Sequence, residues 1–213
     1  MAVTFKQAVA ILKKGGIVGY PTETLYGLGV RIDNLAAIGR LKKLKGRDGK
    51  KPFLIALPGV RSIPKYAHAT RGQLAFLREI LPGPVAVLLK RKATVPPEIT
   101  GGSDLVGIRI PANRLARALA KSVGAITSTS ANPAGKRPAT SASQVERELG
   151  ILSVVPGACK YGKPSTLMNV STGKILREGA YSAEKLAEIW GRHFSEKRQR
   201  AQEARIPQEL FRR

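Results

Sequence analysis

Hydrophobic side chains recur every three or four residues in the first part of the chain, which is the spacing of one face of an α-helix. The sequence predicts a helix over residues 5–12, with Thr4 as its N-cap and Gly15-Gly16 as its end. It predicts a second helix between Asp33 as N-cap and Gly46 as end. The apolar positions behind these two helices are Phe5, Ala8, Val9, Leu12, Leu35, Ile38, Leu41 and Leu44.

Short apolar runs alternate with further helical patterns along the rest of the chain. The runs predict strands over residues 17–20, 53–57, 85–89, 105–110 and 125–128. Further helices are predicted from Thr70, from Pro111, from Ser143 with Glu146 as its capping-box partner, and over residues 182–190. This alternation is typical of an α/β domain, and the adjacent strands near Leu105 indicate a mixed sheet, covered by helices on at least one face.

Composition changes the picture at the C-terminal end. The chain has 213 residues, 43% of them hydrophobic, which suits one domain with a buried core. After Trp190, residues 191–213 carry seven Lys or Arg against three Glu. We therefore expect a catalytic domain over 1–190 and a basic tail over 191–213.

The chain lacks the marks of a membrane or secreted protein. Its longest apolar runs, such as residues 84–89, are far shorter than the roughly 20 residues of a membrane span, and Lys6 precedes any run that resembles a signal sequence. The single cysteine, Cys159, cannot form an internal disulfide. We expect a soluble cytoplasmic protein without a membrane partner.

A formal net charge of +23 indicates a polyanionic partner, either a nucleotide or a nucleic acid. A solvated basic surface explains the charge equally well, and no known RNA-binding module is visible. The sequence offers few residues for a zinc site or a nucleophilic triad, since its only histidines are His68 and His193. Residues 157–163 have the spacing of a phosphate-binding P-loop, but Pro164 replaces the Ser or Thr that would bind Mg²⁺.

Polar segments follow several predicted strands, at the edge where open α/β sheets usually bind ligands. They are residues 19–29, rich in Thr and Gly; Lys45-Gly46-Arg47 with Lys50-Lys51; Gly107-Ile108-Arg109-Ile110; and residues 128–135. Each has an ordinary interpretation as a turn or solvated helix end, except Arg109, whose place in an apolar strand requires an anionic partner. Together they offer cations, hydroxyls and backbone donors, which suit phosphoryl or nucleotidyl transfer without naming a reaction.

Six motifs, in order and spacing, resemble the YrdC-like family over about residues 4–190. They are Tyr20-Pro21-Thr22-Glu23-Thr24-Leu25-Tyr26-Gly27-Leu28, Lys45-Gly46-Arg47, Pro82-Gly83-Pro84, Gly107-Ile108-Arg109-Ile110-Pro111, Ser128-Thr129-Ser130-Ala131-Asn132 and Leu176-Arg177-Glu178-Gly179. The resemblance implies a twisted open mixed sheet flanked by helices, with a basic concave face. It also implies that the enzyme converts L-threonine, bicarbonate and ATP to threonylcarbamoyl-adenylate and pyrophosphate, which supplies the machinery that modifies tRNA adenosine.

The resemblance also implies roles for individual residues. Lys45, Arg47, Ser130 and Asn132 would be catalytic; these four with Lys51 and Arg177 would bind ATP; Thr24, Arg109, Ser128 and Ser165 would bind threonine. Mg²⁺ is expected with the ATP, and no metal bound by the protein. A sister group lacks the Lys-x-Arg and Ser-x-Asn pairs that stand here at 45/47 and 130/132.

Three departures from the family pattern concern threonine contact: Asp48 in place of proline, Ala56 in place of a histidine of longer relatives, and residues 167–169. Two alternatives remain at this point. One is an RNA-binding or ribosome-associated module of the same fold, for which tRNA or another RNA is the partner. The other is a diverged paralogue that uses another amino acid or carbamoyl donor.

Overall fold

One sheet organises the chain in the computed structural model, which describes residues 2–46 and 51–203. Its strands run in the order β1-β2-β7-β3-β6-β5-β8-β9, and β4 pairs with β5 outside this path. They are β1 (Val18–Tyr20), β2 (Gly27–Gly29), β3 (Leu54–Ala56), β4 (Ala67–His68), β5 (Val85–Arg91), β6 (Leu105–Arg109), β7 (Ile126–Ser130), β8 (Thr166–Asn169) and β9 (Ile175–Arg177). The pairs β3/β6 and β5/β8 are parallel and the others antiparallel, so the predicted mixed sheet is confirmed.

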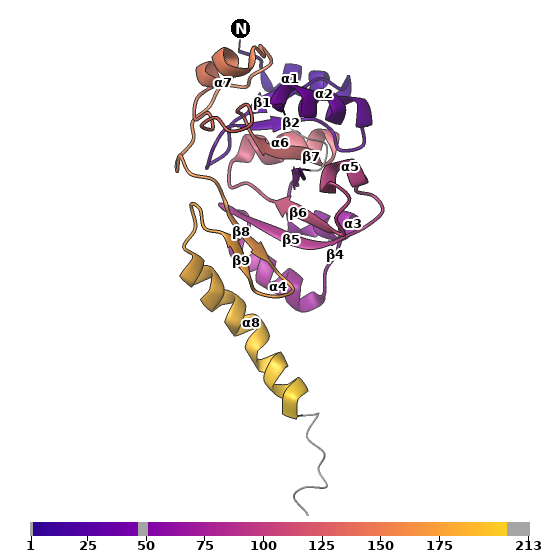
Figure 1. The fold of residues 1–213 in the computed structure, drawn as a ribbon, viewed down its shortest axis with the longest axis vertical. Coiled ribbons are helices and arrows are strands. Elements are labelled where there is room, and N and C mark those ends of the chain that lie inside the picture. The colour runs from indigo at the N-terminus through magenta and orange to yellow at the C-terminus, as the bar shows by residue number, and fades with distance from the viewer. Residues whose placement is uncertain (1, 47–50, 204–213) are drawn as a thin grey trace, which may run out of the picture.

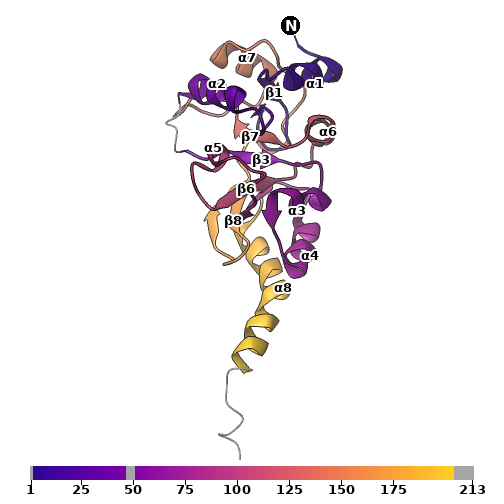
Figure 2. The same cartoon turned by 90° about the vertical axis from the view of Figure 1, so that its right-hand side faces the viewer.

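The helices that flank the sheet are α1 (Phe5–Lys13), α2 (Leu35–Lys45), α3 (Ile63–Tyr66), α4 (Arg71–Ile80), α5 (Pro97–Thr100), α6 (Arg114–Val123), α7 (Ala142–Leu149) and α8 (Ala183–Glu203), with a 3-10 turn at Val60–Ser62. Figure 1 shows α1, α2 and α7 at the end of the molecule that holds the N-terminus, and α8 at the opposite end. Figure 2 shows from the side that α8 leaves the body and projects away from it.

Two hydrophobic cores cover the two faces of the sheet. The larger core contains Ile55 and side chains of α2, α4 and α8, whereas the smaller one joins Ala56 to α1 and α6. Ile55 and Ala56 are consecutive in β3, and successive strand residues point to opposite faces, so the two cores lie on opposite sides of the sheet. The smaller core leaves part of its face uncovered.

Several helix ends confirm the predictions and others correct them. Thr4 caps α1 in a capping box with Gln7, Thr70 caps α4, and Gly46 ends α2 in the left-handed conformation that glycine permits. Asp33 is not the N-cap of α2, because its carboxylate pairs with Arg31 and Asn34 accepts from the backbone of Ala37 instead.

Two further helix starts were predicted at the wrong residue. The N-cap of α6 is Asn113, so the helix begins at Arg114 rather than near Pro111. The cap of α7 is Ser141 with Gln144 as its capping-box partner, not Ser143 with Glu146. For α7 an equally good cap, Ser141, lies two residues before the predicted one. For α6 the predicted start at Pro111 overlooked the Asn113 cap.

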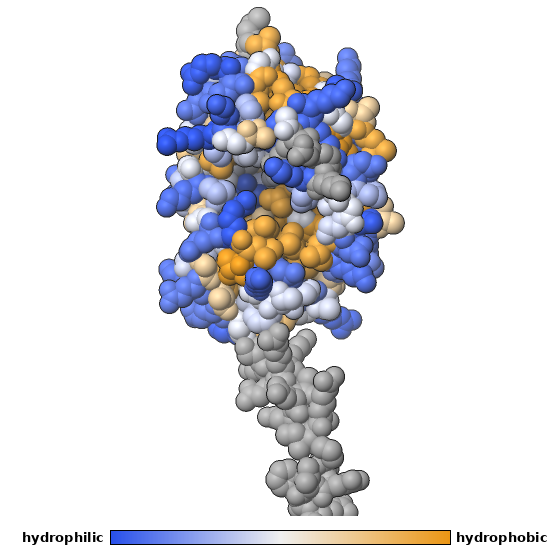
Figure 3. Space-filling view, viewed as in Figure 1, coloured by the Kyte–Doolittle hydropathy of each residue, from blue (hydrophilic) through white to orange (hydrophobic). Residues whose placement is uncertain are grey.

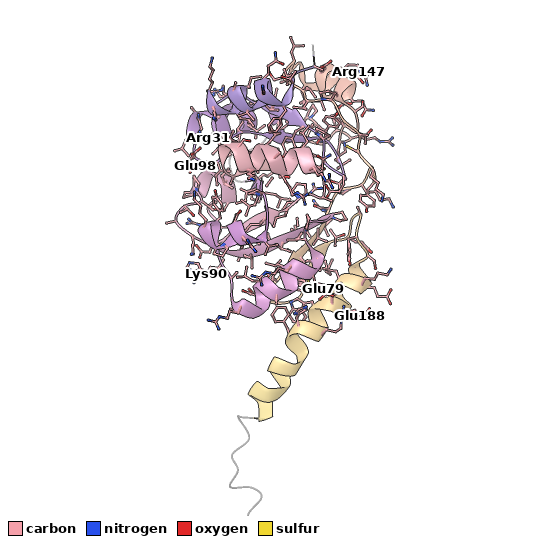
Figure 4. All side chains as sticks on the ribbon, turned by 180° about the vertical axis from the view of Figure 1, so that it is seen from behind. Arg31, Glu79, Lys90, Glu98, Arg147 and Glu188 are labelled. Carbon is pink, nitrogen blue, oxygen red and sulfur yellow. The ribbon has the colours of Figure 1, made fainter. Side chains whose placement is uncertain are left out.

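The last helix is longer than predicted, since α8 continues through Gly191 to Glu203. Its first half packs on the body: the Trp190 indole donates to the Val170 carbonyl over 2.8 Å, and the Phe194 ring lies 5.8 Å from the Phe76 ring of α4. Arg192 and His193 contact the Glu79 carboxylate at 2.9 and 2.8 Å, on the side drawn in Figure 4. The first residues of the predicted tail therefore belong to a packed helix.

Candidate functional site

The uncovered part of the sheet forms a pocket of about 440 Å³. Strands β2, β3, β6, β7, β8 and β9 each contribute to it, so residues far apart in sequence meet there. Its lining is Thr24, Leu25, Tyr26, Gly27, Pro52, Leu54, Arg109, Ser128, Thr129, Ser130, Pro138, Pro164, Ser165, Leu167 and Arg177. Figure 3 shows the molecule hollowed near the middle of one face, with apolar residues gathered below the hollow.

Sheet register explains why these side chains share one pocket. Leu54 of β3 pairs with Ser128 of β7, and Leu167 of β8 pairs with Arg177 of β9. Paired residues point to the same face of a sheet, so each pair presents both of its members to the pocket. Gly107 keeps the floor open between them, since a Cβ there would lie 2.2 Å from Leu54 Cδ2.

Arg109 lines the pocket and is only 6% exposed. Its Nη2 donates to Thr24 Oγ1 at 2.6 Å and to Glu23 Oε1 at 3.0 Å, with Thr22 Oγ1 at 3.2 Å. The anionic partner that the sequence required is therefore Glu23. The Nε atom is buried and has no hydrogen-bond partner within residues 2–46 and 51–203, so the guanidinium retains a donor for a ligand.

Ser165 and Arg177 also line the pocket and contact each other. Arg177 donates from Nε and Nη2 to the Ser165 carbonyl at 3.1 and 2.8 Å. Desolvation of the guanidinium, and secondly the positive charge of Arg109, lower the pKa of Arg177, although an arginine stays protonated at neutral pH. The two arginines thus act on the same space and favour an anion between them.

Lys45 stands behind the pocket rather than in its lining. The side chain is 1% exposed, and its ammonium donates to the carbonyls of Ser130 and Asn132, the second at 2.6 Å. Asn132 donates from Nδ2 to the carbonyls of Pro133 and Lys136. Lys45 and Asn132 therefore stabilise the turn that follows β7. Ser130, at the end of β7, lines the pocket.

The remaining predicted residues lie around the segment 45–52. Lys51 is exposed and precedes Pro52, which lines the pocket. Arg47 and Asp48 lie outside the described residues. Thr24, Arg109, Ser128, Ser130, Ser165 and Arg177 are thus brought together in one pocket, whereas Lys45, Lys51 and Asn132 adjoin it without lining it.

The other candidate chemistries find little support in the structure. Residues 157–163 are followed by strand β8 instead of a helix, so they do not form a P-loop. Burial raises the pKa of the Cys159 thiol, which disfavours the reactive thiolate. Across residues 2–46 and 51–203, no group of three or more His, Cys, Asp and Glu side chains could hold a metal ion.

Sequence reasoning missed two kinds of site residue. Leu54, Pro52 and Pro138 are apolar or lack a reactive group, so no chemical signal marks them. Glu23 lies inside the Thr-rich motif, and an acidic residue there is a signal for the anionic partner that Arg109 requires. Of the departures, Leu167 lines the pocket and Ala56 lies in the smaller core, in register with Arg109.

Comparisons with known proteins agree with this architecture. A family model that covers the Sua5, YciO and YrdC proteins, described as "Telomere recombination", matches residues 10–179. The chain belongs to this family. The threonylcarbamoyl-AMP synthase of Thiobacillus denitrificans is 42% identical over 172 residues, which are 79% of this chain and 92% of that protein. A putative threonylcarbamoyl-AMP synthase of Methanocaldococcus jannaschii is 35% identical over 193 residues, 85% of this chain and 90% of that protein.

Solved structures of the family share the fold. Sua5 of P. abyssi, determined in complex with L-threonine, superposes with a TM-score of 0.81 at 29% identity; the match covers 87% of this chain and 56% of that one. The chain therefore spans little more than half the length of that relative. E. coli YciO superposes with a TM-score of 0.75 at 24% identity, over 84% of this chain and 90% of that one. Within the described part of the chain, no helix is long and apolar enough to cross a membrane.

Proposed function

We propose that this chain is a threonylcarbamoyl-AMP synthase, which makes threonylcarbamoyl-adenylate and pyrophosphate from L-threonine, bicarbonate and ATP. One observation carries the proposal. The four residues assigned from sequence to threonine binding, and Ser130 and Arg177 of those assigned to ATP, line a single pocket, in a chain that is 42% identical to a protein named for this activity. Among the described residues, the pocket lining contains hydroxyls and cations but no carboxylate, which matches a site that binds anions rather than one that removes protons.

The first substrate is threonine, whose carboxylate we assign to Arg109. The Nε atom of the buried guanidinium has no partner among the described residues, and a charge-assisted contact to a carboxylate is among the strongest hydrogen bonds available. Thr24, Ser128 and Ser165 lie around the same space and offer hydroxyls to the substrate. Bound in this way, the amino group of threonine is held in the pocket, where it combines with bicarbonate to form a carbamate and water.

The second step is an in-line displacement at the α-phosphorus of ATP. A carbamate oxygen forms the new P–O bond, the bond to the β-phosphate oxygen breaks, and pyrophosphate leaves with both electrons. Arg177 and Ser130 line the pocket where the phosphates would lie, and Arg47 and Lys51 are assigned to the same triphosphate. The charge that develops on the leaving group is stabilised by fixed cations and backbone donors, so no protein nucleophile is required.

Mg²⁺ is proposed as the companion of ATP and not as a resident of the protein. The described lining of the pocket contains hydroxyls but no carboxylate, and Mg²⁺ in nucleotide sites is usually held by substrate phosphates with one or two carboxylates. The donor set therefore fits an ion that arrives on the triphosphate. When bound, it would neutralise phosphate charge, and none of the residue roles above depends on it.

The partners follow from the product. A carbamoyl-adenylate is a reactive mixed anhydride, so we place this reaction directly ahead of the enzymes that transfer the threonylcarbamoyl group to tRNA, and we propose the cytoplasm as the compartment of both. Direct contact with tRNA or another RNA remains a proposal that rests on the net charge of +23. An RNA-binding module without turnover is not favoured, because the relatives that match along most of their length are named as synthases. The decisive test is whether pyrophosphate release from ATP depends on threonine and bicarbonate.

We also propose that the residues beyond the catalytic domain contribute no part of the pocket. Truncation after Trp190 removes the Phe194, Arg192 and His193 contacts to α4. We expect it to lower the thermal midpoint by about 3–6 °C, whereas truncation after Ser195, which keeps these contacts, should change it by less than about 2 °C.

Both truncated proteins should retain turnover. The measurements are thermal unfolding and threonine-dependent pyrophosphate release at a temperature well below both midpoints. Loss of turnover in either protein while it remains folded would show that the tail contributes to catalysis.

A further inference from the structure

Glu23 is a buried carboxylate that takes no part in the reaction proposed above. It is 8% exposed, and it does not line the pocket. A carboxylate is costly to bury unless its oxygens are hydrogen-bonded and its charge is paired. The hydrogen-bond partners of the Glu23 carboxylate therefore indicate its role.

The carboxylate is held on two sides. Glu23 Oε1 accepts from Arg109 Nη2 at 3.0 Å, and Oε2 accepts from the backbone amide of Asn113 at 3.3 Å. Asn113 is itself fixed, because its side chain caps α6 through the amides of Leu115 and Ala116. The orientation of the Glu23 carboxylate is thus tied to the N-terminus of a helix.

The main chain of Glu23 is fixed as well. Its carbonyl accepts from the amides of Lys160 and Tyr161, each at 2.9 Å. These two residues belong to the segment that leads to the pocket residues Pro164 and Ser165. Glu23 therefore contacts both the pocket residue Arg109 and the segment that leads to Pro164 and Ser165.

Arg109 is constrained in a way that leaves one side of its guanidinium for substrate. Its hydrogen bonds to described residues all run through Nη2, to Thr22, Glu23 and Thr24. Fixing Nη2 fixes the plane of the whole guanidinium, because the group is planar. The orientation of the remaining donors is then set before a ligand binds.

We propose that Glu23 is a positioning residue for substrate, which orients Arg109 so that its remaining donors meet the carboxylate of threonine. The inference rests on the proposed function for the identity of that substrate. Glu23 also adjusts the charge of the site, because its carboxylate pairs with Arg109 and offsets the positive charge of that guanidinium.

Orientation and charge predict opposite effects when Glu23 is replaced by glutamine. If only charge mattered, the more positive site would bind the threonine carboxylate more tightly, and the KM for threonine would fall. If orientation matters, Arg109 loses its fixed plane and the KM rises, since a bidentate contact depends on geometry.

We expect Glu23→Gln to raise the KM for threonine at least about tenfold and to lower kcat, while the KM for ATP changes less than about twofold. Threonine affinity by calorimetry should fall in parallel. Glu23→Asp retains the charge but is one methylene shorter, so it should give a smaller rise of about threefold. If Glu23→Gln does not fold, the KM of Glu23→Asp for threonine tests the inference instead.

Asp33→Asn is the matched control, because it also removes a carboxylate from an arginine pair, at an exposed site remote from the pocket lining. Its KM values should equal those of the wild type. An unchanged or lower KM for threonine in Glu23→Gln, or equal changes for threonine and ATP, would overturn the inference and leave the proposed function intact. Failure of the wild-type protein to bind threonine would overturn both.

Discussion

Replacing Lys45 with methionine is expected to reduce adenylate formation by about a hundredfold to a thousandfold while the protein stays folded. Loss of one fixed charge-stabilising contact in an active site typically costs 10²–10³ in kcat, about 3–4 kcal/mol. The structure adds a physical reason. The buried ammonium donates to the carbonyls of Ser130 and Asn132, so it both holds the turn after β7 and supplies a positive charge close to the pocket.

Methionine suits the test because it has nearly the shape of lysine and leaves no cavity. Some loss of stability is expected, since two carbonyls lose a donor, so turnover is compared well below the unfolding midpoint. Lys43→Met is the control, because Lys43 lies on the same helix and is exposed. Near-normal turnover of Lys45→Met would show that Lys45 is not needed for catalysis.

Arg47 lies outside the residues that the structure describes. We expect Arg47→Ala to reduce turnover by a similar factor, measured in the same assay.

Replacing Arg109 with lysine is expected to weaken threonine binding at least about thirtyfold, with ATP binding largely preserved. Lysine keeps the charge beside Glu23, so the buried pair is not left as a lone carboxylate, which would cost several kcal/mol. Its single ammonium cannot contact Glu23 and Thr24 and also make a bidentate contact to a substrate carboxylate.

Calorimetric titration of threonine and of a non-hydrolysable ATP analogue separates the two effects. Arg91→Lys is the control, because Arg91 lies on the neighbouring strand β5 and contacts the Ser103 and Val95 carbonyls outside the pocket. Equal losses of affinity for both ligands would show that Arg109 is structural or faces the phosphates.

Much of the fold could be predicted from the pattern of apolar residues. The long helices α1, α2 and α4, and the five strands with continuous apolar runs, appear within a few residues of their predicted positions. The apolar runs predict these strands well because most of their residues are buried on both faces of the sheet, even in β1 at the end of the strand order. Short elements carry no such pattern: β2 is Gly-Leu-Gly, and β8 and β9 contain polar residues because one face borders the pocket.

The site could be predicted in part. The family resemblance implied binding roles for Thr24, Arg109, Ser128, Ser130, Ser165 and Arg177, and the structure places all six in one pocket. The detailed tasks of Lys45 and Glu23 could not be predicted, because they depend on which atoms lie opposite in space. Lys45 meets carbonyls that are 85 and 87 residues away, and Glu23 meets an arginine 86 residues away. Such contacts follow from sheet register, which sequence pattern leaves undetermined.

The most direct test of the account is pyrophosphate release from ATP by the purified full-length chain, measured with threonine and bicarbonate both present and with each omitted in turn. We predict release only when both are present, little with serine in place of threonine, and an adenylate product whose mass includes the carbon of labelled bicarbonate. Release that is independent of threonine or of bicarbonate, or no release in a folded protein that binds RNA, would contradict the assignment as a threonylcarbamoyl-AMP synthase.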